Sequence, residues 1–446
     1  MKTIKVIGAG LAGCEAAWQA AKRGVKVELY EMKPEKKSPA HHADTFAELV
    51  CSNSLRSNDV TSGVGLLKEE LRRMGSLIME AADATQVAAG GALAVDRKLF
   101  SEYITNKINE HPLINVNYGE VTDIPDDGVT VIATGPLTSD AMAHKISELI
   151  GGNKLSFFDA AAPIVDFNSI DMEKAFFASR YDRGTPDYIN CPMTEDEYKA
   201  FYNALVTAEE AQLHDFDKNE KLKVFEGCMP VEVMARRGED TLRFGPMKPV
   251  GIHRPNSDES YYAVVQLRRE NESGTMFNIV GFQTHLTFPE QRRVFRMIPG
   301  LENADFLRYG VMHRNTFLNS PDLLNRDYSM RNNPSLFFAG QMTGVEGYIE
   351  SAASGFICGV SAAMRVAEMD SYIFPDTTMI GAMAQYVSCG GASVFQPMNA
   401  NFGIIANPEI KIKGGKKPRY EYYAKRALDK IDCIIEEKCI DFTLAE

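Results

Sequence analysis

The sequence lacks the closely spaced cysteine and histidine patterns that bind metal ions or form a disulfide framework. Its eight cysteines include no C-x-x-C pair, and its eight histidines include no H-x-x-x-H spacing. A structural metal site is therefore not expected. The cysteines are expected to be reduced thiols, as in a cytoplasmic protein.

The chain also lacks an apolar run long enough to cross a bilayer, so no membrane association is expected. Of the 446 residues, 45% are hydrophobic and 24% are charged, which is typical of a soluble globular protein. The formal net charge of −12 argues against general coating of nucleic acid, although a local basic segment can still bind RNA. The length predicts two or three domains, and nothing in the sequence indicates an obligate protein partner.

The stretch KVIGAGLAGCEAA, residues 5–17, fits two incompatible patterns. Its LAGC tetrapeptide resembles the lipid-attachment site of a bacterial lipoprotein, whereas Gly8, Gly10 and Gly13 match the G-x-G-x-x-G turn that holds a dinucleotide pyrophosphate. A signal peptide needs an apolar core of about 7–15 residues. The three glycines, each weakening a helix by roughly 1 kcal/mol, argue against such a core. The dinucleotide interpretation is therefore favoured.

The residues after this turn complete a dinucleotide-binding unit. Residues 15–23 favour a helix that ends at Gly24, and residues 25–31 alternate like a strand that ends on Glu31. A carboxylate about 20 residues beyond the turn can accept hydrogen bonds from ribose hydroxyls. The predicted cofactor-binding residues of this unit are Gly8, Ala9, Gly10, Leu11, Ala12, Gly13 and Glu31.

A second strand–turn–helix unit lies late in the chain. Residues 335–340 are apolar, residues 341–347 are rich in glycine, and small residues from Tyr348 onward predict a helix. Such a helix N-terminus offers backbone N–H groups to a phosphate or to the edge of a flavin. Two separated units favour FAD over NAD, and a nicotinamide is expected to bind only transiently. The predicted contacts of this unit are Gly340, Gln341 and Gly344.

Between the two units the pattern changes to short strands separated by glycine and proline turns. The predicted fold class is therefore α/β: an FAD-binding Rossmann-like domain, of the type found in two-dinucleotide-binding flavoproteins, with an inserted, strand-rich α+β domain. The predicted parts are 1–155 and 326–446 for the FAD-binding domain, the latter ending in a basic segment, and 156–325 for the inserted substrate domain.

Two cysteines lie in predicted loops whose composition is compatible with a reactive thiol. Cys51 follows AELV and precedes SNS, and Cys228 lies in FEGCMP between a glycine and a turn proline. Composition alone leaves open whether each is a reactive thiolate or a small buried hydrophobe, the usual state of an unpaired cysteine. Cys14 and Cys358, in small-residue helices, are predicted to be structural, and Cys191 stays undecided.

Several segments resemble, in order and spacing, the folate- and FAD-dependent tRNA (uracil-5-)-methyltransferases of the TrmFO family. They are IKVIGAGLAGCEAA, AELVCSNSLRSN, AGGALAVDR, FEGCMPVEVMARRGEDTLRFGPMKPVG, GFQTHL and FAGQMTGVEGYIESAASG. The similarity covers nearly the whole chain. It implies methylation of C5 of the T-loop uridine of tRNA to 5-methyluridine. Methylenetetrahydrofolate would be the carbon donor, reduced FAD the reductant, and NADPH or NADH the transient source of electrons.

The resemblance also implies roles for the two loop cysteines. Carbon 5 of uracil becomes nucleophilic only after a group adds at C6, and a thiolate is suited to that step. Cys228 is implied as the C6 nucleophile and Cys51 as the general base, although the sequence alone does not rank them. The folate carries its carbon at the formaldehyde level, so two further electrons are needed to reach a methyl group.

The segment KIKGGKKPRYEYYAKR, residues 411–426, is basic in an otherwise acidic chain and contains interleaved tyrosines. Phosphate contacts and stacking rings are features of RNA binding, so Lys416, Lys417 and Arg419 are predicted RNA contacts. A solvated charged loop and helix is the alternative. Three pairs of adjacent arginines could extend a basic stripe: Arg236–Arg237, Arg268–Arg269 and Arg292–Arg293.

Three other functions remain compatible with these features. The same chemistry could act on a uridine of ribosomal RNA. The chain could be a flavin oxidoreductase for a small molecule, with turnover that needs no RNA. It could also be a non-catalytic RNA-binding flavoprotein, in which both loop cysteines would be dispensable.

Overall fold

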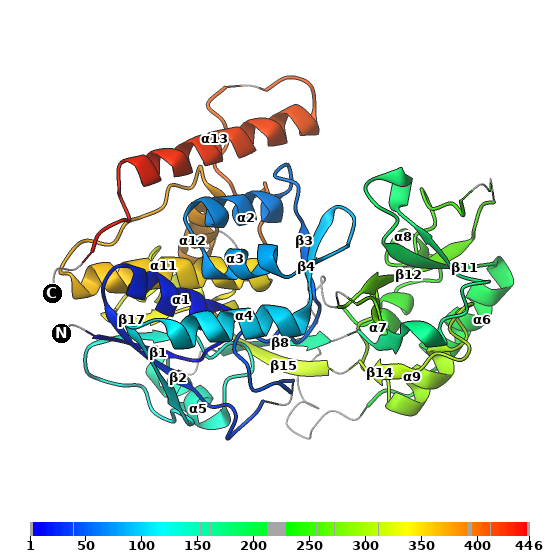
Figure 1. The fold of residues 1–446 in the computed structure, drawn as a ribbon, viewed down its shortest axis with the longest axis horizontal. Helices are drawn as coiled ribbons and strands as arrows, with labels where there is room; N and C mark the ends of the chain where they lie inside the picture. The colour runs from blue at the N-terminus through cyan, green and yellow to red at the C-terminus, as the bar shows by residue number, and fades with distance from the viewer. Residues whose placement is uncertain are drawn as a thin grey trace.

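The described part of the chain forms a larger domain and a smaller inserted domain (Figure 1). The computed structural model describes residues 3–38, 40–151, 154–160, 162–211, 229–255, 257, 259–271, 273–310, 312–389, 395–410 and 412–443. Each domain has its own sheet and its own hydrophobic core. The two cores are joined by the antiparallel ribbon of β8 (Lys154–Ala160) and β15 (Met312–Leu318).

The sheet of the larger domain is mainly parallel, with β1 at its centre. The strands in order are β16 (Ser329–Met330), β17 (Asn333–Phe338), β7 (Val129–Ile132), β1 (Thr3–Ile7), β2 (Lys26–Glu31) and β6 (Ile114–Tyr118). Only the edge pair β16–β17 is antiparallel among these pairings. Because helices cover the central strands, β7 is buried throughout and is continuously apolar apart from Thr130. This is the predicted Rossmann-like architecture.

Helices and a small antiparallel sheet complete the larger domain. The helices are α1 (Leu11–Lys22), α2 (Gly63–Arg73), α3 (Leu77–Ala84), α4 (Arg97–Glu110), α5 (Asp140–Leu149), α10 (Ser320–Leu323), α11 (Tyr348–Val366), α12 (Met379–Cys389) and α13 (Lys416–Glu436). The small sheet contains β3 (Ser54–Ser57), β5 (Ala92–Val95) and β4 (Gln86–Val87). None of the helices in the described residues combines the length and apolar character needed to cross a membrane.

Close packing of α1 on α11 brings the two predicted cofactor-binding units together. A Cβ added at Gly355 would lie 2.2 Å from the carbonyl oxygen of Ala12, and one at Gly359 would lie 2.4 Å from that of Ala16. Only small residues permit this approach of the two backbones, which explains the small-residue composition of both helices. The turns that precede α1 and α11 therefore lie next to each other, although more than 300 residues separate them.

The inserted domain is built on an antiparallel sheet. Its strands in order are β10 (Phe176–Ala178), β11 (Tyr188–Met193), β12 (Ala263–Arg269), β13 (Met276–Ile279), β9 (Ile164–Asp166) and β14 (Phe306–Arg308). Its helices are α6 (Glu195–Val206), α7 (Val231–Ala235), α8 (Thr241–Phe244) and α9 (Phe288–Phe295). Strands together with helices in separate segments give the predicted α+β character.

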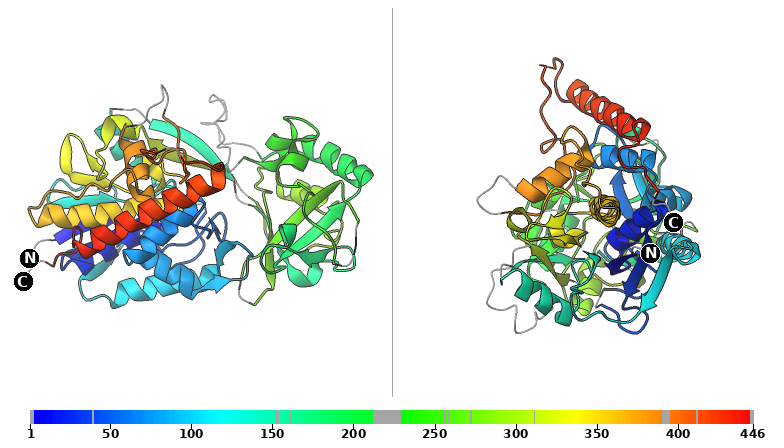
Figure 2. Two further views of the ribbon diagram at one scale, coloured as in Figure 1. Left: turned by 90° about the horizontal axis from the view of Figure 1, so that it is seen from above. Right: turned by 90° about the vertical axis from the view of Figure 1, so that its left-hand side faces the viewer.

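The last helix, α13, forms an outer layer on the larger domain (Figure 2, red). Its inner face buries Tyr423, Ala427 and Ile431. The Arg73 guanidinium of α2 lies 2.7 Å from the Asp432 carboxylate of α13. The N-terminal end of α13 points toward the side of the molecule that carries the inserted domain (Figure 1).

Candidate active site

Each glycine of the turn after β1 meets a different steric requirement. Gly8 has a φ of +101°, and a Cβ there would lie 2.6 Å from the carbonyl oxygen of Ala133. A Cβ on Gly13 would lie 1.8 Å from the carbonyl oxygen of Gly8. Gly10, in contrast, has no described atom within 4 Å of its Cβ position. A dinucleotide-binding turn needs these three properties: a tight turn, an open approach to the pyrophosphate and close packing of helix on strand.

A cavity with about 1160 Å³ of empty space begins at this turn. It follows the carboxyl ends of β1, β2, β7 and β17, where ligands of parallel sheets bind. Most of the predicted cofactor-binding residues line it: Gly8, Ala9, Gly10, Leu11, Ala12, Glu31, Gly340 and Gln341. Gly13 lies behind the wall as a packing residue. Gly344 is absent from the described lining, because its Cβ position faces the ring of Phe395 at 2.4 Å.

The Glu31 carboxylate is buried at the end of β2 and held against the cavity wall. It accepts hydrogen bonds from the backbone N–H of Ala9, at 2.8 Å, and of Lys33, at 2.9 Å. Each carboxylate oxygen retains acceptor capacity, so ribose hydroxyls can still donate to it. The Glu31 side chain thus fits the predicted role.

The helix N-termini at the cavity differ from those of three neighbouring helices of the larger domain. Helices α2, α3 and α4 are capped by the side chains of Ser62, Ser76 and Asp96. Helices α1 and α11 begin after Gly10 and Gly347, and neither has a side-chain cap among the described residues. Their first N–H groups are therefore available to an anionic ligand. Together with the open Gly10 backbone and the Glu31 carboxylate, these features fit FAD.

The cavity wall also contains residues that the sequence-based prediction missed. Residues 133–139 follow β7, and their signal was the apolar strand that ends in Ala-Thr-Gly. His41 comes from the long connection after β2, where no recognisable pattern marks it. Burial and the nearby positive charge of Lys33 lower the pKa of His41, so its imidazole is neutral at the cavity wall.

Tyr348, the first residue of α11, links the cavity to the segment that carries Cys51. Its hydroxyl oxygen accepts hydrogen bonds from the backbone N–H of Cys51, at 2.8 Å, and of Ser52, at 3.0 Å. Burial and the negative charge of a Cys51 thiolate raise the pKa of Tyr348, so the hydroxyl stays protonated. Because Tyr348 and Val50 both line the cavity, half-buried Cys51 lies directly beside it.

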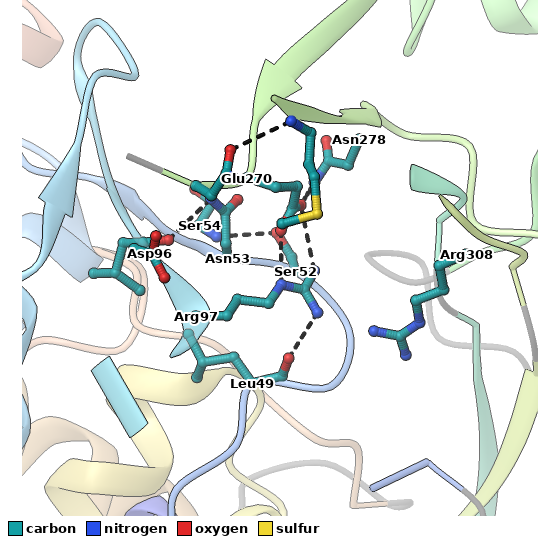
Figure 3. A network of polar contacts seen from close by, with 12 residues as sticks. Leu49, Ser52, Asn53, Ser54, Asp96, Arg97, Glu270, Asn278 and Arg308 are labelled. Carbon is teal, nitrogen blue, oxygen red and sulfur yellow. Dashed lines mark hydrogen bonds and ion pairs between the residues drawn. The ribbon is translucent and has the colours of Figure 1, made fainter. Parts of the chain in front are cut away.

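Residues 49–53, here called the Cys51 loop, are held between the two domains by a polar network (Figure 3). Arg97 of α4 is central to it. Its guanidinium lies 2.7 Å from the Glu270 carboxylate of the inserted domain and donates to the carbonyl oxygen of Leu49 at 2.7 Å. Glu270 also accepts a hydrogen bond from Asn278 of β13. One ion pair therefore ties the loop, α4 and the inserted sheet together.

Further contacts from the inserted domain complete the anchoring of the loop. The Arg308 guanidinium donates to the carbonyl oxygen of Val50 at 2.7 Å, and Arg268 donates to Ser52 Oγ at 2.6 Å. The Asn53 amide donates to the carbonyl oxygen of Arg269 at 2.8 Å. The backbone on both sides of Cys51 is thus fixed by residues more than 200 positions away in the chain.

Two positively charged side chains, Arg97 and Arg308, lie near the Cys51 sulfur. Burial and Arg97 lower the pKa of Arg308, whereas a Cys51 thiolate acts in the opposite direction. Burial lowers the pKa of the Arg97 guanidinium, whereas the negative charges of Glu270 and of a Cys51 thiolate raise it. Because such interactions are reciprocal, both cations stabilise a Cys51 thiolate. Figure 3 shows the guanidinium ends of Arg97 and Arg308 pointing toward each other across this loop.

The remaining cysteines fall into two groups. Cys228, the predicted nucleophile, lies in 212–228, outside the described residues. Cys14, Cys191 and Cys358 are fully buried, and burial raises the pKa of each thiol. These three cysteines are structural, which also resolves the undecided case of Cys191. Among the described residues, no group of three or more His, Cys, Asp and Glu side chains could hold a metal ion.

The predicted RNA-contacting residues Lys416, Lys417 and Arg419 are exposed on the first turn of α13. The tyrosines that follow have another role. The ring of Tyr420 stacks on Phe402 with centroids 4.5 Å apart, and Tyr423 is buried against the same ring. The prediction that these tyrosines offer stacking surfaces to RNA is therefore wrong for Tyr423, which is buried and anchors α13, whereas it stays a prediction for half-buried Tyr420.

The predicted pairs of adjacent arginines also have different environments. Arg268 is buried at the domain interface, where it anchors the Cys51 loop, so it does not extend a surface stripe. Arg236 forms an ion pair with Glu210. Arg292 and Arg293 are exposed on α9.

Comparison with known proteins agrees with this architecture. The family model described as glucose inhibited division protein A matches residues 3–370. Methylenetetrahydrofolate–tRNA-(uracil-5-)-methyltransferase TrmFO of Acetivibrio thermocellus is 60% identical, covering 95% of this chain and 97% of the relative. The protein of that name from Lactobacillus delbrueckii subsp. bulgaricus is 57% identical, with coverages of 98% and 99%.

Among solved structures, GidA of Aquifex aeolicus in its form I crystal superposes with a TM-score of 0.70 at 17% identity. The superposed part covers 97% of this chain and 76% of the GidA chain. This likeness shows the fold, and it agrees with the predicted α/β, Rossmann-like class. The predicted family is likewise confirmed by the nearly full-length identity to the curated relatives. The chain belongs to the TrmFO family, within the broader family described as glucose inhibited division protein A.

Proposed function

We propose that this protein methylates C5 of the T-loop uridine of tRNA, with methylenetetrahydrofolate as carbon donor and reduced FAD as reductant. The proposal is carried by the identity of 60% over 95% of the chain to a relative named for this activity. It is supported by the position of Cys51 beside a cavity that fits FAD. The reaction takes place in the cytoplasm.

The cavity residues bind the cofactor along its length. The backbone from Gly8 to Ala12 and the start of α1 receive the pyrophosphate, and Glu31 accepts the ribose hydroxyls. Gly340, Gln341 and the start of α11 hold the isoalloxazine end. When bound and reduced, FAD supplies the two electrons that convert a formaldehyde-level carbon to a methyl group.

Cys51 and Cys228 divide the covalent and proton-transfer steps. The Cys228 thiolate forms a bond to C6 of uracil, which makes C5 nucleophilic toward the methylene carbon of the folate. Cys51 then removes the proton from C5, and the C–N bond to the folate breaks, which releases tetrahydrofolate and leaves a methylene group on C5. A hydride equivalent from the reduced cofactor would convert this methylene to methyl, and the bond from Cys228 to C6 breaks as the C5–C6 double bond forms again. Arg97 and Arg308 keep Cys51 ready to accept that proton by favouring its anionic form.

Other ligands bind outside this core. NADPH or NADH would supply the electrons from a transient complex, since no second glycine-rich dinucleotide turn was found in the sequence. Lys416, Lys417 and Arg419 contact tRNA phosphates from the exposed end of α13.

The test uses the purified full-length protein. Its flavin absorbance is recorded first, and unmodified tRNA is then incubated with labelled methylenetetrahydrofolate and either NADPH or NADH. We expect label in 5-methyluridine of the T loop, identified by nuclease digestion and mass spectrometry. Label only in ribosomal RNA fragments would move the substrate to ribosomal RNA. Turnover of the reduced nicotinamide without any labelled RNA would contradict the proposal.

A further inference from the structure

The inserted domain carries a surface hollow that the proposed chemistry does not use. It has about 950 Å³ of empty space between α9 and the chain after β14, and its lining shares no residue with the described lining of the cofactor cavity. We call it the aromatic–arginine groove, and its described lining residues are Phe288, Pro289, Arg292, Arg293, Arg296 and Tyr309.

A stack of aromatic rings forms one wall of the groove. Tyr309 stacks on Phe288, with centroids 4.8 Å apart and planes at 15°, and on Phe306, at 5.4 Å and 14°. Phe288 ends this stack and is 52% exposed. An exposed ring backed by a second parallel ring is a rigid platform on which a further planar ring can stack.

Positive charge lies beside the platform. The Arg292 guanidinium donates to the Tyr309 hydroxyl at 2.6 Å, and Arg296 donates to the carbonyl oxygen of Ala304 at 2.8 Å. Arg293 is paired with Glu290 at 2.6 Å, whereas no ion pair of Arg292 or Arg296 is found among the described residues. Two guanidinium groups that are fixed by neutral acceptors keep their charge for an anion, in a chain whose formal net charge is −12.

The groove lies next to the segment that anchors the Cys51 loop. Tyr309 is the neighbour of Arg308, and the Arg308 guanidinium reaches the carbonyl oxygen of Val50. The backbone between Arg308 and Tyr309 therefore connects the groove to an anchor of the Cys51 loop. The flavin end of the cavity lies beyond that loop, so a nicotinamide bound in the groove would not touch the flavin, as hydride transfer requires.

We propose that the aromatic–arginine groove binds an unpaired nucleotide of the RNA substrate. Its base stacks on Phe288, and its phosphate lies beside Arg292 and Arg296. This inference rests on the proposed function and adds a contact site on the inserted domain, separate from the basic end of α13.

The test measures tRNA binding and turnover in the full-length flavoprotein. Truncating an aromatic side chain on which one base stacks lowers the affinity for the nucleic acid by about 5- to 100-fold. We therefore expect Phe288→Ala to raise the tRNA dissociation constant and KM in this range with kcat at saturating tRNA unchanged. Phe288→Tyr, which keeps the ring, should retain wild-type affinity. Arg292→Gln combined with Arg296→Gln should lower the slope of log affinity against log salt by about 1 to 2.

The matched control is Phe244→Ala, because Phe244 is 80% exposed on α8, which Figure 1 shows at the opposite end of the inserted domain from α9. This variant should bind tRNA like wild type, and all variants should retain their flavin. Wild-type affinity in Phe288→Ala, or an equal loss in Phe244→Ala, would overturn the proposal. A raised KM for the reduced nicotinamide with normal tRNA affinity would also overturn it. Failure of the wild type to methylate any RNA would instead refute the proposed function.

Discussion

The cofactor cavity and the Cys51 loop lie side by side, but the chain builds them in different ways. The cavity is made of short segments that follow consecutive parallel strands, and backbone geometry at a few glycines shapes it. The Cys51 loop is anchored by side chains from both domains, with sequence separations of 173 residues for Arg97 to Glu270 and 258 residues for Arg308 to Val50. On the proposed function, binding of the cofactor is therefore expected to be a property of one domain, whereas catalysis is expected to depend on how the two domains meet.

This difference predicts that flavin content and methylation activity respond to different substitutions. Changes at the domain interface should reduce turnover and leave the flavin bound. Changes at the glycine turn should remove the flavin first. The following predictions test this separation, beginning with the largest effect.

Substitution of either proposed catalytic cysteine should abolish methylation with little loss of flavin. We expect Cys51→Ala and Cys228→Ala each to lower kcat/KM by about 1000-fold or more, since a reacting group is removed. The two differ with RNA that contains 5-fluorouridine, which traps a nucleophile bonded to C6. The covalent adduct should form in Cys51→Ala and be absent in Cys228→Ala, as read by gel mobility. An adduct that survives in Cys228→Ala would refute the assignment of the nucleophile.

Loss of the interdomain ion pair should affect both stability and turnover. In Arg97→Met, the Glu270 carboxylate stays buried without its cationic partner, which should lower the free energy of unfolding by about 3–5 kcal/mol. Methylation should fall because Leu49 also loses its contact, whereas flavin content at low temperature should stay normal. The double variant Arg97→Met with Glu270→Met should recover stability and remain poorly active. Equal loss of flavin and activity in Arg97→Met would show that the cavity depends on this interface.

Two glycines of the same turn should respond in opposite ways to one added methyl group. Gly13→Ala places a Cβ at 1.8 Å from the carbonyl oxygen of Gly8, so overpacking should destabilise the apoprotein by about 1–3 kcal/mol. Gly10→Ala meets no described atom within 4 Å, so its apoprotein should unfold at the wild-type temperature. Its added methyl group projects into the space reserved for the pyrophosphate, and a fluorescence titration should show FAD affinity lowered about tenfold or more. Unchanged affinity in Gly10→Ala would place the pyrophosphate elsewhere.

Glu70 in the larger domain should make stability depend on pH without affecting the Cys51 loop. Its carboxylate accepts hydrogen bonds from the backbone N–H groups of Met379 and Ile380, and burial raises its pKa from 4.5 to about 7. Between these values the unfolded chain releases the proton and the folded chain keeps it. The free energy of unfolding should therefore fall as pH rises from 4.5 to 7, by up to about 1.4 kcal/mol per pH unit.

The matched control is Glu70→Gln, which should flatten this part of the curve in denaturant titrations. The pH dependence of kcat should be the same in Glu70→Gln and in the wild type, because Glu70 touches neither the cavity lining nor the Cys51 loop among the described residues. An unchanged stability curve in Glu70→Gln would assign the pH dependence to other buried groups.

The comparison also explains what could be predicted from the sequence. The glycine turn and Glu31 were found because their steric and hydrogen-bonding requirements fall within one short segment of chain. Gly344 stays a predicted contact, although its Cβ position packs against Phe395. The anchors of the Cys51 loop were missed because no local pattern links Arg97 to Glu270 across two domains. Interleaved tyrosines suit both helix packing and base stacking, and burial alone distinguishes the two.

The smallest expected effect concerns the exposed end of α13. Replacing Lys416, Lys417 and Arg419 together by glutamine removes only solvated charges, so stability, flavin content and kcat should stay unchanged. Affinity for tRNA should fall by about 3- to 10-fold, and the salt slope should drop by about 2 to 3 if each charge meets one phosphate. A control with the same change in net charge replaces exposed lysines on other surfaces: Lys26, Lys98 and Lys199.

The control separates local contact from general attraction. Net charge acts on the rate of encounter from any surface, whereas a direct phosphate contact releases a counterion and therefore appears in the salt slope. If both triple variants lower affinity equally and leave the slope unchanged, α13 acts only through its charge. The direct contacts would then lie on the inserted domain, and the domain that supplies most anchors of the Cys51 loop would also be the one that holds the RNA.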